Sequence, residues 1–359
     1  MSEIKKIGVL TSGGDCSGLN AAIRAVVKKA TQLGWEVYGI QEGTVGLMQR
    51  PLGIIKLDDT NVNANFLRMG GTILRTINKG DPFNYPMPDG TFKDRSHEIV
   101  AGYKELGLDA LIAIGGDGSM RIIEKITALG NIKFIGIPKT IDNDVPFTEF
   151  PIGFMTAVSV AVESIERLHD TALSHKRVMV AEVMGRDVGH LALHSGIAGG
   201  ADVILIPEIP YDINAVAKKI KEVYNSGRNY AIVVCSEAAT TKEGTQSFAV
   251  GAENKRYGGV GHIIGEALEK LTGFETRVTT LGHTQRGGSP IPLDRIIASA
   301  FGVRAVELLH SGADKRVVGW ANKKVIDVPL HDITSTSGAV DLNGDMVKTA
   351  RGLDISFGE

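Results

Sequence analysis

Cysteine is scarce in this chain, since its 359 residues include only Cys16 and Cys235. Two thiols cannot build the disulfide framework of small secreted domains, and neither lies in a spacing typical of metal ligands. A reactive thiol at Cys16, which falls in a glycine-rich stretch, would require a specific electropositive setting. We therefore interpret Cys16 as a small filler residue, and we exclude a disulfide framework and a cysteine metal site.

An excess of charge and long apolar runs are missing as well. Lysine and arginine together number 39 against 41 acidic residues, so no long-range field favours DNA, RNA or an anionic membrane. No apolar run reaches membrane-spanning length, and the first residues carry no apolar signal region. We expect a cytoplasmic protein with no nucleic-acid partner and no membrane contact, in which clustered basic residues have a local purpose.

The chain does have the length and the hydrophobic content, 43%, for about two domains. Short β-branched runs alternate with amphipathic segments, which predicts mostly parallel sheets covered on both faces. The expected fold is α/β, with two doubly wound, mostly parallel sheet domains flanked by helices and the active site in the cleft between them. Strand and helix pairs are expected at 7–11 and 19–33, 110–114 and 119–129, 178–183 and 188–198, 203–206 and 213–224, 230–235 and 259–271, and 277–281 and 293–309.

The sequence pattern changes between Asp144 and Pro151, and a long helical stretch follows, which indicates a domain boundary. We expect a first domain over residues 1–152, completed by about 285–330, and a second over 153–284. Residues 331–359 show little periodicity and form a C-terminal extension of unknown role.

The 44 glycines cluster where apolar runs end. Two strand-to-helix junctions repeat one theme, Thr-Ser-Gly-Gly-Asp at 11–15 and Gly-Gly-Asp-Gly-Ser at 115–119. Glycine lets the backbone approach phosphate oxygens, and the N-terminus of the next helix favours an anion. A carboxylate among phosphate-binding amides needs a cation, so Asp117 is the candidate Mg²⁺ ligand. Alternatively, the glycines form tight turns and the aspartates cap helices.

A third junction follows the strand expected at 133–137 and reads Pro-Lys-Thr-Ile-Asp-Asn-Asp at 138–144. Phosphoryl transfer to a hydroxyl needs a carboxylate that takes the proton, with cations and donors around the phosphoryl. Asp142 supplies the carboxylate, Lys139 and Thr140 supply the charge and the donor, and Asp144 is a further polar acceptor. The alternative is an Asx-turn cluster in which Asp142 and Asn143 bind local backbone.

Four arginines fall near strand ends, namely Arg177, Arg186, Arg277 and Arg286. A single arginine is usually a solvated side chain, but four near strand ends predict a substrate that already carries a phosphate. His283 lies in the same stretch as Arg286. It is either part of that site or a buried, hydrogen-bonded core histidine.

Together these segments resemble the 6-phosphofructokinase family, from residue 6 to about residue 309. The resemblance implies a donor-binding first domain and a sugar-phosphate-binding second domain. It implies that the γ-phosphoryl of ATP moves to the 1-hydroxyl of fructose 6-phosphate, with Mg²⁺ on Asp117 and with Asp142 accepting the hydroxyl proton. Arg186 would lie near the transferred phosphoryl. The implied catalytic residues are Lys139, Thr140, Asp142, Asp144 and Arg186.

The resemblance also implies the binding residues. The donor would contact Gly13, Asn78, Lys79, Gly115, Gly116, Asp117, Gly118 and Ser119. Fructose 6-phosphate would contact Thr140, Ile141, Asp142, Met184, Gly185, Arg186, Glu237, His283, Thr284, Gln285 and Arg286. Arg177 and Arg277 match arginines that reach the sugar phosphate of a neighbouring subunit, so a homodimer or a homotetramer is implied.

Two positions bear on the phosphoryl donor. Gly118 is typical of family members that use ATP, since pyrophosphate users commonly carry an aspartate there that would collide with the α-phosphate of a nucleotide. Lys139 resembles the pyrophosphate users. A steric block is close to all-or-none, whereas an added lysine can contact ATP phosphates, so Gly118 favours ATP. At Asn78 and Lys79 many relatives place an arginine, for which Lys79 is a point-charge substitute.

Three alternatives stay open. A pyrophosphate-dependent fructose-6-phosphate phosphotransferase would follow if Lys139 outweighed Gly118. A nicotinamide-dependent oxidoreductase fits glycine loops on a parallel sheet, but the dinucleotide fingerprint is incomplete. A non-catalytic sugar-phosphate sensor would keep the arginines without needing both Asp117 and Asp142.

Overall fold

The structure is a computed structural model that describes residues 4–78, 80–244, 258–336 and 338–359. The chain divides into two compact units. The first contains Met1–Thr140, Val145–Met155 and Arg286–Ser337, and the second contains Ile141–Asp144, Thr156–Gln285 and Gly338–Glu359.

The sheet of the first unit has a parallel centre and antiparallel edges. Its strand order is β14-β13-β7-β6-β1-β2-β3, with β8 paired to the end of β7. Only the edge pairs β13–β14 and β2–β3 are antiparallel. The strands are β1 (Lys6–Thr11), β2 (Glu36–Ile40), β3 (Ile54–Leu57), β6 (Ala110–Gly115), β7 (Lys133–Thr140), β8 (Ile152–Gly153), β13 (Arg316–Ala321) and β14 (Lys324–Pro329).

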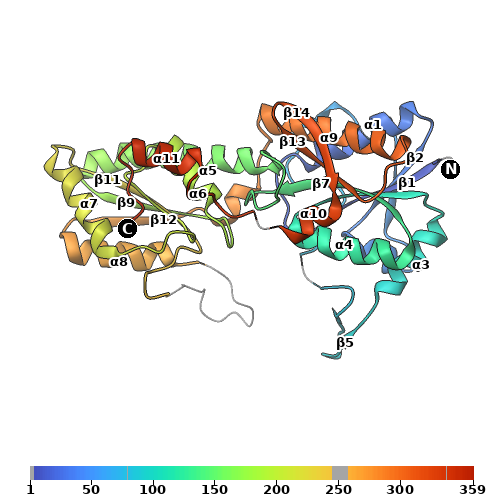
Figure 1. The fold of residues 1–359 in the computed structure, drawn as a ribbon, viewed down its shortest axis with the longest axis horizontal. Coiled ribbons are helices and arrows are strands. Elements are labelled where there is room, and N and C mark those ends of the chain that lie inside the picture. The colour runs from blue at the N-terminus through green and yellow to red at the C-terminus, as the bar shows by residue number, and fades with distance from the viewer. Residues whose placement is uncertain (1–3, 79, 245–257, 337) are drawn as a thin grey trace. The chain divides into compact units, whose positions relative to one another are not determined.

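Helices cover both faces of this sheet (Figure 1). Strand β6 is buried along its whole length, as expected for a central strand that packs on both faces. One face carries α1 (Leu19–Gln32) and α9 (Pro292–His310), and the other carries α2 (Val45–Met48), α3 (Ser96–Leu106), α4 (Asp117–Gly130) and α10 (Leu330–Ser335). A 3₁₀ turn, η1 (Ala64–Leu67), and a small hairpin of β4 (Tyr85–Pro86) and β5 (Phe92–Lys93) complete the unit.

An arginine pair closes the edge hairpin of this unit. Arg304 on α9 and Arg316 on β13 each lie 2.8 Å from the carboxylate of Asp327 on β14. Burial alone would raise the pKa of Asp327, but the hydrogen bonds from the two guanidinium groups outweigh it and hold that pKa below its ordinary value. The hairpin is therefore fixed to α9 by charge-assisted hydrogen bonds.

The second unit has a four-stranded, all-parallel sheet in the order β10-β11-β9-β12. Helices again cover both faces, with a separate apolar core under each (Figure 1). The helices α5 (Phe154–His175), α6 (His190–Ala198) and α11 (Asp345–Gly352) lie on one face, and α7 (Ile213–Asn225) and α8 (Val260–Thr272) lie on the other. The strands are β9 (Val178–Val183), β10 (Val203–Leu205), β11 (Ala231–Ser236) and β12 (Thr276–Thr280), and a 3₁₀ turn, η2 (Gly282–Arg286), follows β12.

Both sheets are mostly parallel and helix-covered, so the predicted fold class is confirmed. The segment expected as a C-terminal extension is divided, because α10 belongs to the first unit and Gly338–Glu359 to the second. Val340, Val347 and Phe357 of this tail are buried in the core beneath α5 and α6. Among the described residues, no helix is both long enough and apolar enough to cross a membrane.

Candidate active site

Three loops leave the same edge of the first sheet. Strands β1, β6 and β7 are parallel neighbours, and their register pairs Thr11 with Ile114 and Gly115 with Pro138. Their carboxyl ends are therefore level, and the loops that follow them share one edge, where ligands of open α/β sheets bind. These loops are the three junctions that the sequence singled out.

The loop after β1 is held by main-chain contacts to residues 76–77. Gly13 has a φ of 83°, in the left-handed region that favours glycine. The N–H of Gly13 donates to the carbonyl of Ile77 at 3.0 Å, and the hydroxyl of Thr76 donates to the carbonyl of Gly13 at 2.6 Å. Asn78 follows Ile77 directly and is exposed, so it lies beside this loop. Lys79 lies outside the described residues.

The loop after β6 turns directly into α4. Gly116 caps the helix in an extended conformation, and Asp117 is its first residue. A Cβ on Gly115 would lie 2.7 Å from the Cβ of Ser119, so this turn tolerates only glycine there without a shift. A Cβ on Gly118 would have no described atom within 4 Å. The N–H groups at the start of α4 and the open side of Gly118 form a surface suited to an anion.

Asp117 is partly engaged by a residue that the sequence analysis missed. The Nε of Arg121, one helical turn on, lies 3.1 Å from both carboxylate oxygens and donates to Oδ2. Oδ1 is buried and accepts no hydrogen bond from the described part of the chain. The i, i+4 spacing of the two residues on a helix was the signal that could have identified Arg121.

This carboxylate fits a magnesium site. Mg²⁺ usually takes one or two carboxylates, keeps waters and completes its ligands with substrate phosphates. In the described residues, no group of three or more His, Cys, Asp or Glu side chains converges on a common point. The oxygen of Asp117 that accepts no hydrogen bond suits such a sparsely held ion.

The side chain of Lys139 connects β7 to the loop after β1. Lys139 is only 4% exposed, and its Nζ donates to the main-chain carbonyl of Gly14. A Cβ on Gly13 would lie 3.2 Å from the same Nζ. The structure thus brings Lys139 beside Gly13, which was predicted to bind the donor, and beside its neighbour Gly14.

The chain continues from Thr140, the last residue of β7, into Ile141–Asp144, which we call the catalytic loop after the role that the sequence predicts for Asp142. Asp142 is 8% exposed, and Ile141 is buried in the packing. Asn143 has a φ of 57°, a conformation that Asn tolerates better than most residues. Oδ1 of Asn143 and Oδ1 of Asp144 are buried and accept no hydrogen bond within the described residues, so an Asx turn through the Asn143 oxygen is absent.

In the second unit, polar contacts join the loops that follow β9, β11 and β12. The main-chain N–H of Met184 donates to Oε1 of Gln285 at 2.9 Å, and that of Arg186 donates to Oε1 of Glu237 at 3.1 Å. Gly185 has a φ of 143°, and a Cβ there would lie 2.7 Å from the carbonyl of Val188. The structure therefore brings these five predicted residues together at one edge of the sheet.

Arg186 itself points into solvent, with 69% of its side chain exposed and Asp187 at 3.5 Å. His283 and Thr284, in the turn after β12, are exposed as well. The alternative that His283 is a buried core residue is therefore wrong. Arg286 donates to the carbonyl of Asp15 at 3.0 Å, which ties it to the loop after β1.

Arg177 and Arg277 lie at the opposite edge of the second sheet. Arg177 precedes β9, and Arg277 is the second residue of β12, so both are at the amino ends of parallel strands. Both pair with Glu275, at 2.8 Å for Arg177, and the hydrogen bond from Arg177 lowers the pKa of that carboxyl. A six-residue strand separates this edge from Met184, roughly 20 Å at 3.3 Å per residue. Within one chain the two arginines cannot join the group around Met184.

Cys16 is not a reactive thiol. It is fully buried, its Sγ donates to the carbonyl of Ile152 at 3.3 Å, and burial raises its pKa to about 12. The interpretation of Cys16 as a filler is confirmed.

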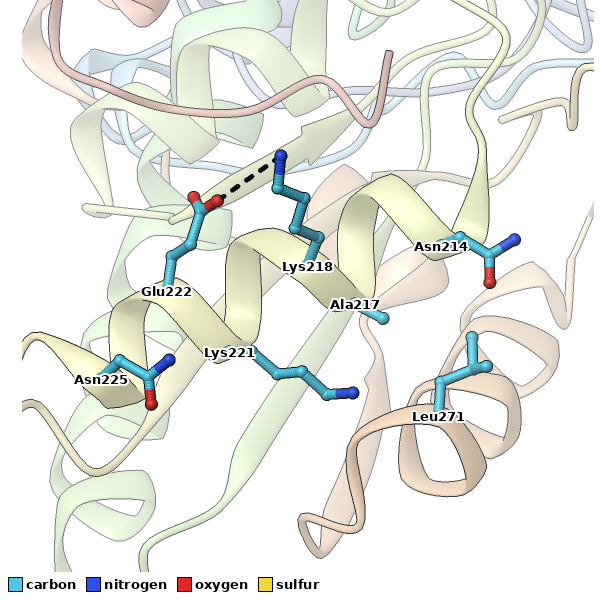
Figure 2. Close-up of a pocket in the computed structure, with 7 residues that line it drawn as sticks. All are labelled: Asn214, Ala217, Lys218, Lys221, Glu222, Asn225 and Leu271. Atoms are coloured by element: carbon cyan, nitrogen blue, oxygen red, sulfur yellow. Dashed lines mark ion pairs between the residues drawn. The ribbon is translucent and has the colours of Figure 1, made fainter.

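A surface pocket of about 410 Å³ lies elsewhere, on the outer side of α7 and α8 (Figure 2). It contains the exposed pair of Lys218 and Glu222, 3.9 Å apart, with Lys221 and Leu271 beside them. None of the predicted site residues lines it.

Comparison with known proteins identifies relatives over the whole chain. The family profile "Phosphofructokinase" matches residues 6–309. The protein "ATP-dependent 6-phosphofructokinase 1" of Synechocystis sp. is 55% identical over 360 residues, which cover 100% of this chain and 99% of the relative.

Solved structures share the fold. Phosphofructokinase from Pichia pastoris in the T-state superposes with a TM-score of 0.82 at 29% identity, over 99% of this chain and 37% of that longer chain. A pyrophosphate-dependent phosphofructokinase from Marinobacter aquaeolei superposes with a TM-score of 0.80 at 20% identity, over 98% and 92% of the chains. The second likeness bears on the fold alone.

Proposed function

The chain belongs to the phosphofructokinase family, and from this premise we propose how its residues carry out the reaction. The enzyme transfers the γ-phosphoryl of ATP to the 1-hydroxyl of fructose 6-phosphate and forms fructose 1,6-bisphosphate, a step of glycolysis. The oxidoreductase and the non-catalytic sensor are thereby set aside. Full-length relatives named as ATP-dependent also favour ATP over pyrophosphate.

Asp142 is the general base of this proposal. A carboxylate positioned beside the 1-hydroxyl takes its proton while the oxygen attacks the γ-phosphorus in line with the departing ADP oxygen. The observation that carries the assignment is the position of Asp142, two residues beyond a strand whose carboxyl end is level with those of β1 and β6. Asp144 and the hydroxyl of Thr140 supply further polar groups beside that base.

The donor phosphates bind to the main chain of two glycine loops. The N–H groups at Gly116–Ser119 would donate to the anion, and the amino end of α4 adds a favourable dipole. The N–H of Gly13 already donates to Ile77, so the loop after β1 would contribute close approach of its backbone to the donor. Lys139 offsets phosphate charge next to Gly13. Asn78 and Lys79 extend the same surface.

Asp117 would hold Mg²⁺ through Oδ1, which accepts no hydrogen bond from the described residues, while Oδ2 accepts one from Arg121. When bound, the ion supplies positive charge to the donor phosphates. Arg121 orients the carboxylate.

The sugar phosphate binds at the carboxyl edge of the second sheet. Glu237 and Gln285 fix the main chain at Met184–Arg186, and the exposed guanidinium of Arg186 would contact the transferred phosphoryl. His283 and Thr284 are exposed and available to hydroxyl groups of the sugar. Arg286, which is tied to Asp15, adds positive charge for the substrate.

A homo-oligomer is part of the proposal, as a dimer or a tetramer. Arg177 and Arg277 lie at the amino edge of their sheet, so they serve the sugar phosphate only across a subunit boundary. A cytoplasmic location fits an enzyme whose two substrates are ATP and a sugar phosphate. The overall test is an assay of the purified enzyme with fructose 6-phosphate and either ATP or pyrophosphate as the donor. Turnover with pyrophosphate but not with ATP would reject the assigned donor.

A further inference from the structure

The tail segment, residues 338–340, lies against the catalytic loop. A Cβ on Gly338 would lie 2.2 Å from the main-chain oxygen of Asp144 and 2.5 Å from its carbonyl carbon. Real Cβ atoms do not approach backbone so closely, so any side chain at 338 must displace the backbone of either the tail segment or the catalytic loop. Gly338 is therefore the residue that lets the tail touch the loop.

The tail segment is fixed on its other side by the start of α6. The Nε2 of His190 donates to the carbonyl of Gly338 at 2.9 Å. Oε1 of Glu208 accepts from the N–H of Val340 and from that of Gly189, at 3.0 Å each. Val340 is 7% exposed and packs in the core beneath α5 and α6.

These contacts leave the tail segment little freedom, and the catalytic loop needs such support. Asn143 is held in the left-handed region, and a conformation of this kind persists when its surroundings over-determine it. The loop just before Gly189 carries Met184, Gly185 and Arg186. The tail segment thus contacts both the catalytic loop and the start of α6, which directly follows the loop predicted to bind the sugar.

We propose that Gly338 is a positioning residue of this reaction: with His190 and Glu208 behind it, it sets the position of Asp144 and so that of Asp142 in the catalytic loop. The proposal rests on the function assigned to Asp142. It gives the tail a role in catalysis beyond its place in the core.

The decisive variant is Gly338→Ala in the full chain. Displacement of the base slows the chemical step more than it weakens substrate binding. The value of kcat should therefore fall on the order of 10- to 100-fold, while KM for both substrates stays within about threefold. The melting temperature should stay within about 4 °C of wild type. The matched control is Gly352→Ala in the same tail, since a Cβ at Gly352 has no described atom within 4 Å; it should keep wild-type kcat. A kcat for Gly338→Ala within twofold of wild type would overturn the proposal.

A double-mutant cycle separates positioning from general damage. If Gly338 acts through the catalytic loop, adding Gly338→Ala to Asp144→Asn should cost less in kcat than it costs in the wild type. Full additivity would contradict the proposal.

His190 gives a test that does not depend on the folding of the alanine variant. His190→Leu removes the donor to Gly338 and should lower kcat several-fold, and His190→Gln, which keeps an N–H donor, should restore most of it. Equal kcat values for the two variants would count against the proposal. Asp142→Asn is measured in parallel: if it retains turnover, the assignment of the base fails, whereas a dead Asp142→Asn beside a normal Gly338→Ala rejects only the role of the tail.

Discussion

The ammonium group of Lys139, at the end of β7, donates to the main-chain carbonyl of Gly14 in the loop after β1. The lysine that resembles those of pyrophosphate users is thus bonded to the glycine loop that is predicted to bind the donor. Its position is compatible with contact to the phosphates of ATP.

Lys139→Met should weaken the donor site without switching its specificity. Loss of a charged hydrogen bond worth about 1.5–3 kcal/mol predicts a fall in kcat/KM for ATP of roughly 10- to 100-fold. Steady-state kinetics with ATP and with pyrophosphate measure it, and Lys93→Met, on the exposed strand β5, is the control. A gain of pyrophosphate activity would contradict this interpretation.

Gly118→Asp should exclude the nucleotide. The new carboxylate would occupy the open side of the donor loop and repel the phosphates, so kcat/KM for ATP should fall by roughly 100-fold or more. Gly118→Ala, which adds only a methyl group in the same open space, separates the effect of charge from that of bulk and should lose far less. If the aspartate variant kept wild-type kinetics with ATP, Gly118 would not face the donor.

Asp142→Asn should lower kcat by roughly 10²–10⁴-fold, as expected when a general base is lost. Binding of fructose 6-phosphate should change little, because the amide keeps the shape of the side chain, and isothermal titration can follow it. Asp89→Asn, in the exposed hairpin loop, controls for expression and handling. Near-wild-type turnover of Asp142→Asn would require another base.

Mixing two inactive variants tests the arginines across the subunit boundary. Arg277→Ala should lose affinity for the sugar phosphate, and Asp142→Asn should lose its base. In a mixed dimer, the subunit with an intact Asp142 receives Arg277 from its neighbour, so roughly a quarter of the sites become competent after random reassociation. Activity that never exceeds that of the separate variants after subunit exchange would place Arg277 in its own subunit's site, or outside the site.

Asp327→Asn should destabilise the first unit in a pH-dependent manner. The folded-state pKa of Asp327 is depressed, so its contribution is present above the unfolded pKa of about 4 and is lost as the pH falls through the folded pKa. Near pH 7 the free energy of unfolding should drop by about 1–2 kcal/mol, and the difference from wild type should shrink below about pH 4. Urea titrations at several pH values measure it. A difference that does not vary with pH would assign the effect to shape rather than charge.

The sequence was sufficient to predict the two sheets and the three loops that follow β1, β6 and β7. Uninterrupted apolar strands such as β6 can only be buried centrally, and the register of β1, β6 and β7 makes their loops neighbours. The sequence groups Arg177 and Arg277 with Arg186 because all three lie near strand ends. In the fold, Arg177 and Arg277 are at the amino ends of their strands, whereas Arg186 follows the carboxyl end of β9.

Contacts between distant segments were also beyond the sequence. Gly338 and Asp144 come into contact only through the tertiary fold, and no local sequence pattern predicts such a contact. Exposure of His283 likewise depends on the turn in which it sits, since an isolated histidine fits a core and a surface equally well.

Between Thr140 and Val145 the chain leaves the first unit for four residues, and those residues are the catalytic loop, grouped with the second. The chain therefore passes from one unit to the other at both ends of these four residues. No contiguous segment of the gene can encode both Met1–Thr140 and Val145–Met155 of the first unit without also encoding Ile141–Asp144, so the proposed base is always exchanged together with these parts of the donor unit.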